Sequence, residues 1–302
     1  MLNMRKDFRL PLGAKAGGLS YSLAVFINML ISIVASAIVT LGALGESDAQ
    51  KYISILVSPV AIGALTALVF AVAKQPVNKV LPVKTHPKYF ALAALLAFGL
   101  LFSLNSVNGY VVKLFELMGY KPRPSFLPDY GGWKIVPVML VVAVLPAIFE
   151  EIFFRGILLF NTEEEVGAVR TIFIVGFCFS LYHGSVEQTV YQFICGCLFA
   201  FLAIRSRSVA PTVLAHFLNN AVVIVLYACG AVDPTTGAII MPRVGEILLY
   251  VFSALSLIGA VVWLVLDKTE LKKVKEGGVK TFFIYASIGI GCMTVFWIAG
   301  LF

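Results

Sequence analysis

The sequence predicts an all-α, polytopic integral membrane helix bundle with eight or nine transmembrane helices. Two observations lead to this class. Hydrophobic residues make up 60% of the 302 residues, and the mean hydropathy is +0.96. Charged residues make up 13%, about half the share of a soluble domain. No repeat or low-complexity segment divides the chain, so residues 1–302 are predicted to form a single integral membrane domain.

Apolar stretches near the bilayer length of ~20 residues recur along the whole chain. Nine of them are predicted to be spans, in the order 19–45, 52–73, 89–115, 134–160, 171–184, 186–204, 209–229, 246–266 and 281–301. The fifth and sixth are short for a bilayer, which is why the prediction is eight or nine spans.

The distribution of basic residues predicts the orientation of the chain. With a cytoplasmic N-terminus and nine spans, sixteen of the 23 Lys and Arg residues fall in cytoplasmic segments and six in outer segments, while Arg155 lies within a span. This excess follows the positive-inside rule. The basic residues therefore indicate contact with anionic lipid and no nucleic-acid partner.

Three charged residues lie within the fourth predicted span, in "FEEIFFRG". A charge at the bilayer centre costs roughly 2.5–3.5 kcal/mol, so Glu150, Glu151 and Arg155 are expected to face the bundle interior or water. Glu151 and Arg155 have the i, i+4 spacing of an ion pair. Glu150 is rotated by about 100° and is predicted to stay free. Pro146 is expected to kink this helix. Alternatively, the charges only mark the end of the span in the headgroup region.

Two further polar motifs fall within spans. His183 ends the fifth span in "FCFSLYHG", and His216 and Asn220 share one face of the seventh in "LAHFLNN". Counted from the cytoplasmic ends at ~1.5 Å per residue, Glu150 lies about 18 Å deep, His183 about 19 Å and His216 about 12 Å. These side chains can therefore meet in one intramembrane cavity. Taken singly, each is also consistent with a structural hydrogen bond between helices.

The three motifs in this order resemble those of the CAAX protease and bacteriocin-processing family. "EEIFFR" matches Glu-Glu-x-x-x-Arg, "FSLYH" matches Phe-x-x-x-His, and "HFLNN" matches His-x-x-x-Asn. The family, also called CPBP or Abi, includes the Ras-converting CAAX prenyl endopeptidases. The resemblance covers roughly residues 134–225, which are expected to form the catalytic core. It implies an intramembrane endopeptidase, and a bacterial or archaeal cell membrane is the expected location.

The resemblance also implies roles for the motif residues. Glu150 and His183 would activate a water molecule, and His216 and Asn220 would stabilise the oxyanion. The ion pair on the fourth span would hold the shape of the site. A carboxylate that takes a proton from water and preorganised N–H donors are the groups that such a hydrolysis needs. No cofactor is favoured.

Several alternatives remain open. Zinc could be held by Glu150, His183 and His216, a three-ligand set of the catalytic kind, although the chain has no His-Glu-x-x-His motif. A proton- or ion-coupled transporter could use the same charges as a relay, and a non-catalytic immunity protein is a third class. The expected substrates are membrane-associated peptides or proteins, lipidated or not: CAAX-type prenylated tails, bacteriocin precursors or membrane-protein precursors.

Overall fold

The computed structural model describes residues 13–45, 47–73, 82–122, 127–233, 239–269 and 277–301. Within these ranges eight helices are long and apolar enough to cross a membrane, and α9 is a shorter apolar helix. The same ranges contain no strand, only an isolated bridge between Val232 and Ile239. The predicted all-α membrane bundle is thereby confirmed. The N-terminal segment and parts of the loops used in the charge count lie outside the described residues.

Most spans are single α-helices, but two contain π-helical segments. In chain order the segments are α1 (Ala14–Leu41), α2 (Asp48–Ala73), α4 (Lys88–Gly99), η1 (Leu100–Leu104), α5 (Asn105–Leu117), η2 (Gly132–Lys134), α6 (Ile135–Met139), η3 (Leu140–Val144), α7 (Leu145–Glu151), η4 (Ile152–Leu159), α8 (Phe160–Val166), α9 (Ala168–Tyr182), α10 (Thr189–Ser206), α11 (Ala210–Ala228), α12 (Arg243–Leu266) and α13 (Gly278–Ala299). Of these, η1, η3 and η4 are π-helical and η2 is a 3₁₀ turn.

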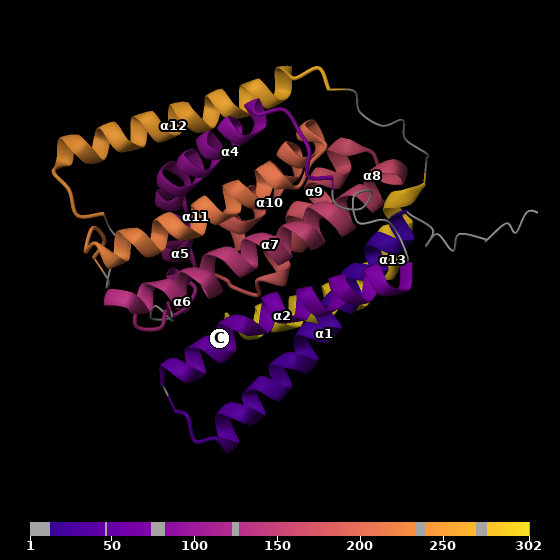
Figure 1. The fold of residues 1–302 in the computed structure, drawn as a ribbon, viewed down its shortest axis with the longest axis horizontal. Coiled ribbons are helices and arrows are strands. Elements are labelled where there is room, and N and C mark those ends of the chain that lie inside the picture. The colour runs from indigo at the N-terminus through magenta and orange to yellow at the C-terminus, as the bar shows by residue number, and fades with distance from the viewer. Residues whose placement is uncertain are drawn as a thin grey trace, which may run out of the picture.

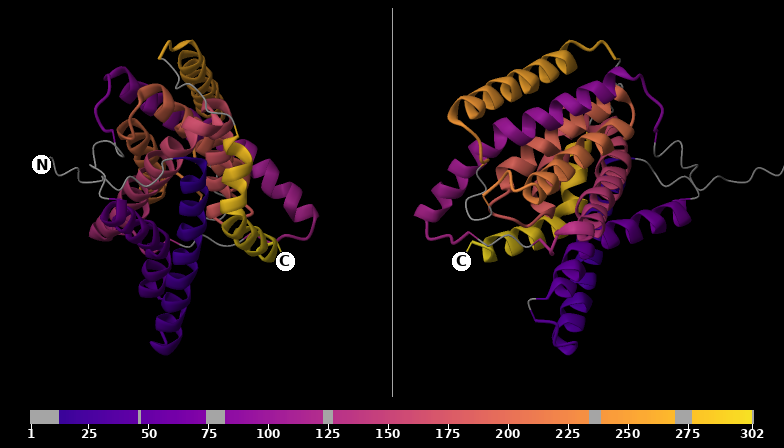
Figure 2. Two further views of the ribbon diagram at one scale, coloured as in Figure 1. Left: turned by 90° about the vertical axis from the view of Figure 1, so that its right-hand side faces the viewer. Right: turned by 60° about the vertical axis from the view of Figure 1, so that its left-hand side comes forward.

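The first two helices form a hairpin that packs against α13 and reaches beyond the other helices (Figures 1 and 2). Small residues bring α1 and α13 close together. A Cβ added at Gly18 would lie 2.4 Å from the carbonyl oxygen of Phe282, and one at Gly289 would lie 2.9 Å from Ser22 Cα. Ser22 also donates to the Tyr285 carbonyl at 2.8 Å. The base of the hairpin is therefore held tightly against α13.

The continuous helix from Gly132 to Val166 runs through the middle of the bundle (Figure 1). Its α7 segment packs against α2 on one side and α11 on the other, and η4 packs against α9 and α10. Helices α9 and α10 form a close antiparallel pair, since a Cβ at Gly196 would lie 2.8 Å from Gly176 Cα. On the far side of α11, α4 packs against both α11 and α12. The charged stretch of the chain is thus surrounded by other helices.

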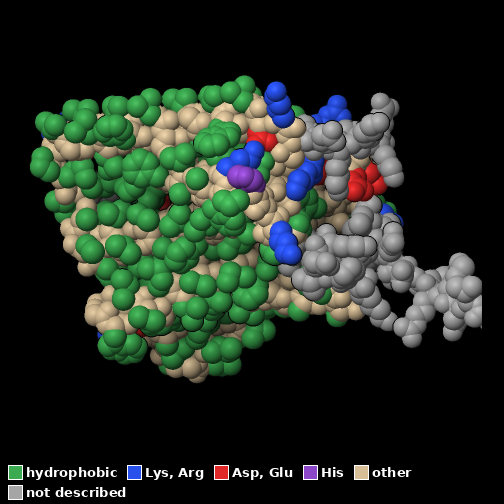
Figure 3. All heavy atoms as spheres, turned by 45° about the horizontal axis from the view of Figure 1, so that its top comes forward, with side chains coloured by type: hydrophobic (Ala, Val, Ile, Leu, Met, Phe, Trp, Pro, Cys, Tyr) green, Lys and Arg blue, Asp and Glu red, His purple; other side chains and the backbone are tan. Residues whose placement is uncertain are grey.

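The outer surface of the bundle is apolar. Large side chains such as Leu41, Leu266 and Ile288 are 88%, 70% and 75% exposed. On the face drawn in Figure 3, hydrophobic side chains cover most of the surface, and Lys, Arg and His gather toward one end. An apolar exterior of this extent needs the bilayer as its solvent, because soluble monomers rarely expose apolar patches larger than a few hundred Å². The protein is therefore an integral membrane protein.

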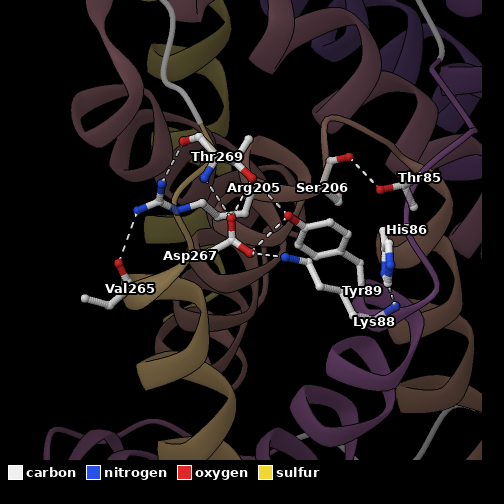
Figure 4. Close-up of polar contacts among 9 residues, drawn as sticks. All are labelled: Thr85, His86, Lys88, Tyr89, Arg205, Ser206, Val265, Asp267 and Thr269. Carbon is white, nitrogen blue, oxygen red and sulfur yellow. Dashed lines mark hydrogen bonds and ion pairs between the residues drawn. The ribbon is translucent and has the colours of Figure 1, made fainter.

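Asp267 and Thr269, just after α12, together join three helix ends (Figure 4). The Asp267 carboxylate accepts hydrogen bonds from Lys88 Nζ at 2.7 Å, Tyr89 Oη at 3.1 Å and the Thr269 N–H at 2.9 Å. Arg205, in the last turn of α10, donates to the Thr269 carbonyl at 3.2 Å. These contacts attach the end of α12 to the start of α4 and the end of α10.

Candidate active site

The two glutamates end α7, between two π-helical segments. Segment η3 ends one residue before Leu145 and Pro146, and η4 begins directly after Glu151. The sequence predicted a proline kink here, and the structure has a wide π-helical turn directly before this proline. Pro146 has no N–H to offer the carbonyl of Val142, four residues earlier, so the α-helical ladder is already interrupted there. Segments of π-helix are rare and occur often at functional sites.

Glu151 and Arg155 form a fully buried ion pair. Arg155 Nη1 lies 2.8 Å from Glu151 Oε1, and both side chains are 0% exposed. This is the pairing that the i, i+4 spacing predicts. The pair therefore lies buried within the bundle, on a helix that continues as far as Val166.

Arg155 connects its own helix with α9 and α10. Its Nη2 donates to the Gly196 carbonyl at 3.2 Å. The guanidinium carbon lies 4.4 Å from the ring centroid of Phe179 and 5.4 Å from that of Phe199. Cation–π contacts of this kind gain strength when they are desolvated. The fold thus gives this buried arginine a counter-ion, a carbonyl acceptor and aromatic neighbours.

Glu150 and His183 face each other at the edge of a cavity. Glu150 is 5% exposed, and its Oε2 has no hydrogen-bond partner among the described residues. His183 Nε2 lies 3.7 Å from that oxygen, which is too long for a direct hydrogen bond. His183 Nδ1 lies 2.8 Å from the carbonyl oxygen of Phe179. A carbonyl only accepts, so Nδ1 carries a proton and Nε2 of the neutral ring presents a lone pair to Glu150.

Gly184 ends the helix directly after His183. Its φ of +58° lies in the left-handed region, where a side chain on the residue is unfavourable. A Cβ at this position would also lie 2.8 Å from the ring of Phe296 on α13. Glycine thus allows α9 to stop at this point and α13 to approach, which leaves the imidazole beside the cavity.

His216 contacts the second glutamate and not the first. Its Nδ1 lies 2.9 Å from Glu151 Oε1, and the histidine is 6% exposed. Its ring lies 6.1 Å from that of Phe179, and the ring of His183 lies 4.6 Å from the same phenylalanine. Both imidazoles therefore lie against Phe179. The sequence predicted that Glu150, His183 and His216 meet, whereas in the structure His216 bonds to Glu151 and shares only the neighbouring ring of Phe179 with His183.

Asn220 lies one turn after His216 on α11 and contacts the π-helical segment. Its Nδ2 donates to the Val142 carbonyl at 3.0 Å. This carbonyl is the one that Pro146 leaves without an α-helical donor. The neighbouring Asn219 accepts from Tyr191 Oη at 2.6 Å on α10. An amide group carries two N–H donors, so Asn220 retains one for a further acceptor.

A cavity of about 630 Å³ opens beside Glu150 and His183. This volume lies within the range of roughly 300–1,000 Å³ that is usual for ligand pockets. Tyr182, Met293 and Phe296 form part of its wall, but the α1–α2 hairpin forms most of it, and neither His216 nor Asn220 lines it.

Sequence reasoning found no functional residue on the hairpin. The sequence does contain a pattern that could have indicated them, because polar residues recur at intervals of four in two rows, three residues on each helix of the hairpin. They are Asn28, Ser32, Ser36, Gln50, Ser54 and Ser58, and all of them line the cavity.

The residues named for a zinc site do not assemble one. Among the described residues, no group of three or more His, Cys, Asp or Glu side chains lies close enough to share a metal ion. The set Glu150, His183 and His216 therefore lacks the convergence that a three-ligand zinc site requires.

The fold and the site define a polytopic membrane protein with a carboxylate and an imidazole beside a cavity between the α1–α2 hairpin and the neighbouring helices. Residues 132–222 match the family model described as Type II CAAX prenyl endopeptidase Rce1-like. This stretch contains all six candidate site residues, and the family resemblance of the sequence motifs is confirmed over it. No curated protein and no solved structure matches the chain. The match supports a CAAX-type intramembrane protease in general.

Proposed function

We propose that the protein is a glutamic-type intramembrane endopeptidase in which Glu150 and His183 activate the attacking water. The observation that carries the proposal is the 3.7 Å approach of His183 Nε2 to Glu150 Oε2 beside the cavity. Both atoms are acceptors, given the His183 tautomer described above. A water molecule can donate one proton to each of them and stay between them.

Hydrolysis from this arrangement balances without a covalent intermediate. Glu150 takes a proton from the water while the water oxygen attacks the carbonyl carbon of the peptide bond. The carbonyl electron pair moves to its oxygen, which becomes the oxyanion. The C–N bond then breaks as Glu150 passes this proton to the departing amine, leaving an amine and a carboxylic acid, which loses its proton to water. General base catalysis of this kind contributes typically 10²–10⁴-fold.

The oxyanion is the part of the reaction assigned to His216 and Asn220. Asn220 supplies the amide N–H that Val142 does not use. His216 Nδ1 is directed at Glu151 and carries a proton there, so its Nε2 can donate only when the ring is an imidazolium. Glu151 is then the counter-ion of both Arg155 and His216. Preorganised donors of this kind are worth about 10²–10³ in rate each.

The substrates we propose are membrane-associated peptides or proteins, either CAAX-type prenylated tails or bacteriocin and membrane-protein precursors. The position of the site among apolar spans and the match to the prenyl endopeptidase family support this class.

The test is Glu150→Gln in protein reconstituted into liposomes. The substrate is an internally quenched peptide with a Cys-aliphatic-aliphatic-X tail, with and without an S-farnesyl group. The substitution keeps the size and removes the base, so turnover should fall by about 10²–10⁴-fold without a loss of folded protein. Glu163→Gln is the matched control, because Glu163 is a buried carboxylate on the same helix that pairs with Arg207 at 2.6 Å. It should lower the melting temperature and keep turnover. Near-normal turnover of Glu150→Gln would overturn the proposal.

A further inference from the structure

The cavity wall formed by α1 and α2 carries two rows of uncharged polar side chains. Asn28, Ser32 and Ser36 follow one another at intervals of four on α1, as do Gln50, Ser54 and Ser58 on α2, and all six line the cavity. The i, i+4, i+8 spacing places each row along one face of its helix. Eight residues of helix rise by about 12 Å. The cavity therefore has two polar tracks of that length, which we call the polar rows.

Two acceptors in these rows have no donor. Asn28 Oδ1 and Gln50 Oε1 are buried, and neither has a hydrogen-bond partner among the described residues. Glu150 Oε2, at the same cavity, is the third such acceptor, and the Tyr182 hydroxyl there also has no hydrogen-bond partner among the described residues. A buried acceptor without a donor costs about 1–3 kcal/mol. Three of them around one cavity indicate a ligand that brings hydrogen-bond donors.

The chemistry of the wall indicates what kind of ligand this is. Apart from Glu150 and His183, the described lining residues carry no titratable acid or base other than Tyr182. Apolar side chains, including Met29, Ile33 and Val57, lie between the polar positions. A wall with neutral acceptors and apolar neighbours fits a neutral polar backbone with apolar side chains better than it fits a charged or sugar-like ligand.

We propose that the polar rows bind the main chain of the substrate in an extended conformation and guide it to Glu150, an inference that rests on the proposed function. An extended chain rises by about 3.3 Å per residue, so a 12 Å track holds three to four residues. Its main-chain N–H groups point alternately to opposite sides. One strand can therefore donate to the α1 row on one side and to the α2 row on the other. The substrates expected for such a site are peptide segments that are extended, not helical, and that carry apolar side chains.

The alternative is that the polar rows only conduct water to the site. The two cases differ in kinetics. Groups that bind the substrate equally in the ground state and the transition state raise KM when they are removed and leave kcat unchanged. Groups that only deliver water would lower kcat. Binding of the main chain, unlike hydration, also depends on the N–H groups of the peptide.

The experiment uses Glu150→Gln protein in detergent, which cannot turn over. The probes are a fluorescein-labelled decapeptide of Val, Thr and Leu residues and its twin, N-methylated at alternate residues. Binding is measured by fluorescence anisotropy. Asn28→Leu and Gln50→Met each remove one acceptor. Ser287→Ala and Ser256→Ala are the controls, because these hydroxyls lie on spans, bond to main-chain carbonyls and do not line the cavity.

We expect each acceptor variant to weaken binding of the decapeptide about tenfold, as the loss of one hydrogen bond predicts. The N-methylated twin should bind weakly to every form, and this result does not depend on how a variant folds. Equal binding of the two peptides, or no binding of the decapeptide, would overturn the proposal.

Cleavage of the quenched peptide by protein with Glu150 intact separates the proposal about the polar rows from the proposed function. Turnover with an unchanged KM in the acceptor variants refutes the polar rows alone. Binding that depends on the acceptors, without any turnover, refutes the proposed function alone.

Discussion

Asn220 donates its side-chain amide to the main-chain carbonyl of Val142, 78 residues away in the chain. That carbonyl lies four residues before Pro146, which has no N–H to give it. The asparagine thus satisfies an acceptor that the proline frees and at the same time fixes the distance between α11 and the helix of the glutamates.

We predict that Asn220→Ala and Asn220→Asp both lower kcat by about 10²–10³-fold, because each removes an N–H donor from the oxyanion. An ionised Asp would also place a negative charge beside the Val142 carbonyl. Ser287→Ala is the control, because its hydroxyl bonds only to the Ile284 carbonyl of its own helix, α13, and its loss should leave turnover unchanged. Turnover and melting in detergent are the measurements. Wild-type turnover in Asn220→Asp would remove the oxyanion role.

Glu151→Gln should destabilise the protein strongly. The substitution leaves the Arg155 guanidinium without its counter-ion at a site that is 0% exposed. Breaking a buried pair by removing one partner costs about 3–5 kcal/mol. Unfolding in detergent should show the loss, and the double variant Glu151→Gln with Arg155→Met should recover part of it. If Glu151→Gln is as stable as wild type, the pair does not hold the site together.

Metal removal should leave the activity intact. The motivation is the arrangement of Glu150, His183 and His216, which do not converge on one point. Exhaustive dialysis against EDTA should change kcat by less than twofold, and elemental analysis of the purified protein should find no stoichiometric zinc. Loss of turnover with EDTA and its return with added zinc would establish the metalloprotease alternative.

The Asp267 contacts should make stability sensitive to acid. Burial alone would raise the pKa of Asp267, but the hydrogen bonds from Lys88, Thr269 and Tyr89 outweigh it and hold the pKa well below its usual range. A lowered folded-state pKa stabilises the fold above the unfolded value of about 3.9, and this stabilisation is lost as the pH falls through the folded value. Asp267→Asn should therefore lower the melting temperature at pH 7, and the difference from wild type should shrink below about pH 4. A difference that does not depend on pH would contradict this account.

The orientation of the chain can be read from a native thiol. Cys229 is the exposed one of the five free cysteines and directly follows α11, at a loop that the basic-residue count places outside. A membrane-impermeant maleimide should label it in intact cells, and Cys229→Ser should abolish the labelling. Labelling confined to inside-out vesicles would reverse the predicted topology.

The elements that could be predicted from the sequence are those set by local patterns. The spans follow from apolar stretches of bilayer length, and the contact between Glu151 and Arg155 follows from their spacing on one helix. The relative positions of Glu150, His183 and His216 could not be predicted in this way. Their motifs lie on three helices, and a motif does not determine which side chain of another helix its histidine contacts. Here His216 contacts Glu151 instead of joining Glu150.

Other features depend on tertiary contacts that no single stretch of sequence encodes. In the π-helical turn before Pro146, a main-chain carbonyl accepts a hydrogen bond from Asn220, which lies on a helix far along the chain. The cavity exists because the α1–α2 hairpin packs beside α13, and the spacing of Asn28 and Ser32 acquires a meaning only beside Glu150. The interval of four was visible in the sequence, but such serines also occur in spans as ordinary helix-packing residues.

The ion pair of Glu151 and Arg155 has a consequence for how the protein enters the membrane. Both partners belong to one helix, so they can pair as soon as that helix forms, before α9 and α10 have been synthesised. The pair then reaches the translocon as a nearly neutral unit and avoids the full penalty of two separate charges. The Gly196 carbonyl and the ring of Phe199 come from a later helix and complete the surroundings of the guanidinium. If the counter-ion of Arg155 lay on a later helix, the arginine would be inserted into the bilayer before its partner was synthesised. Because both partners lie on one helix, insertion does not pass through a state with an unpaired arginine.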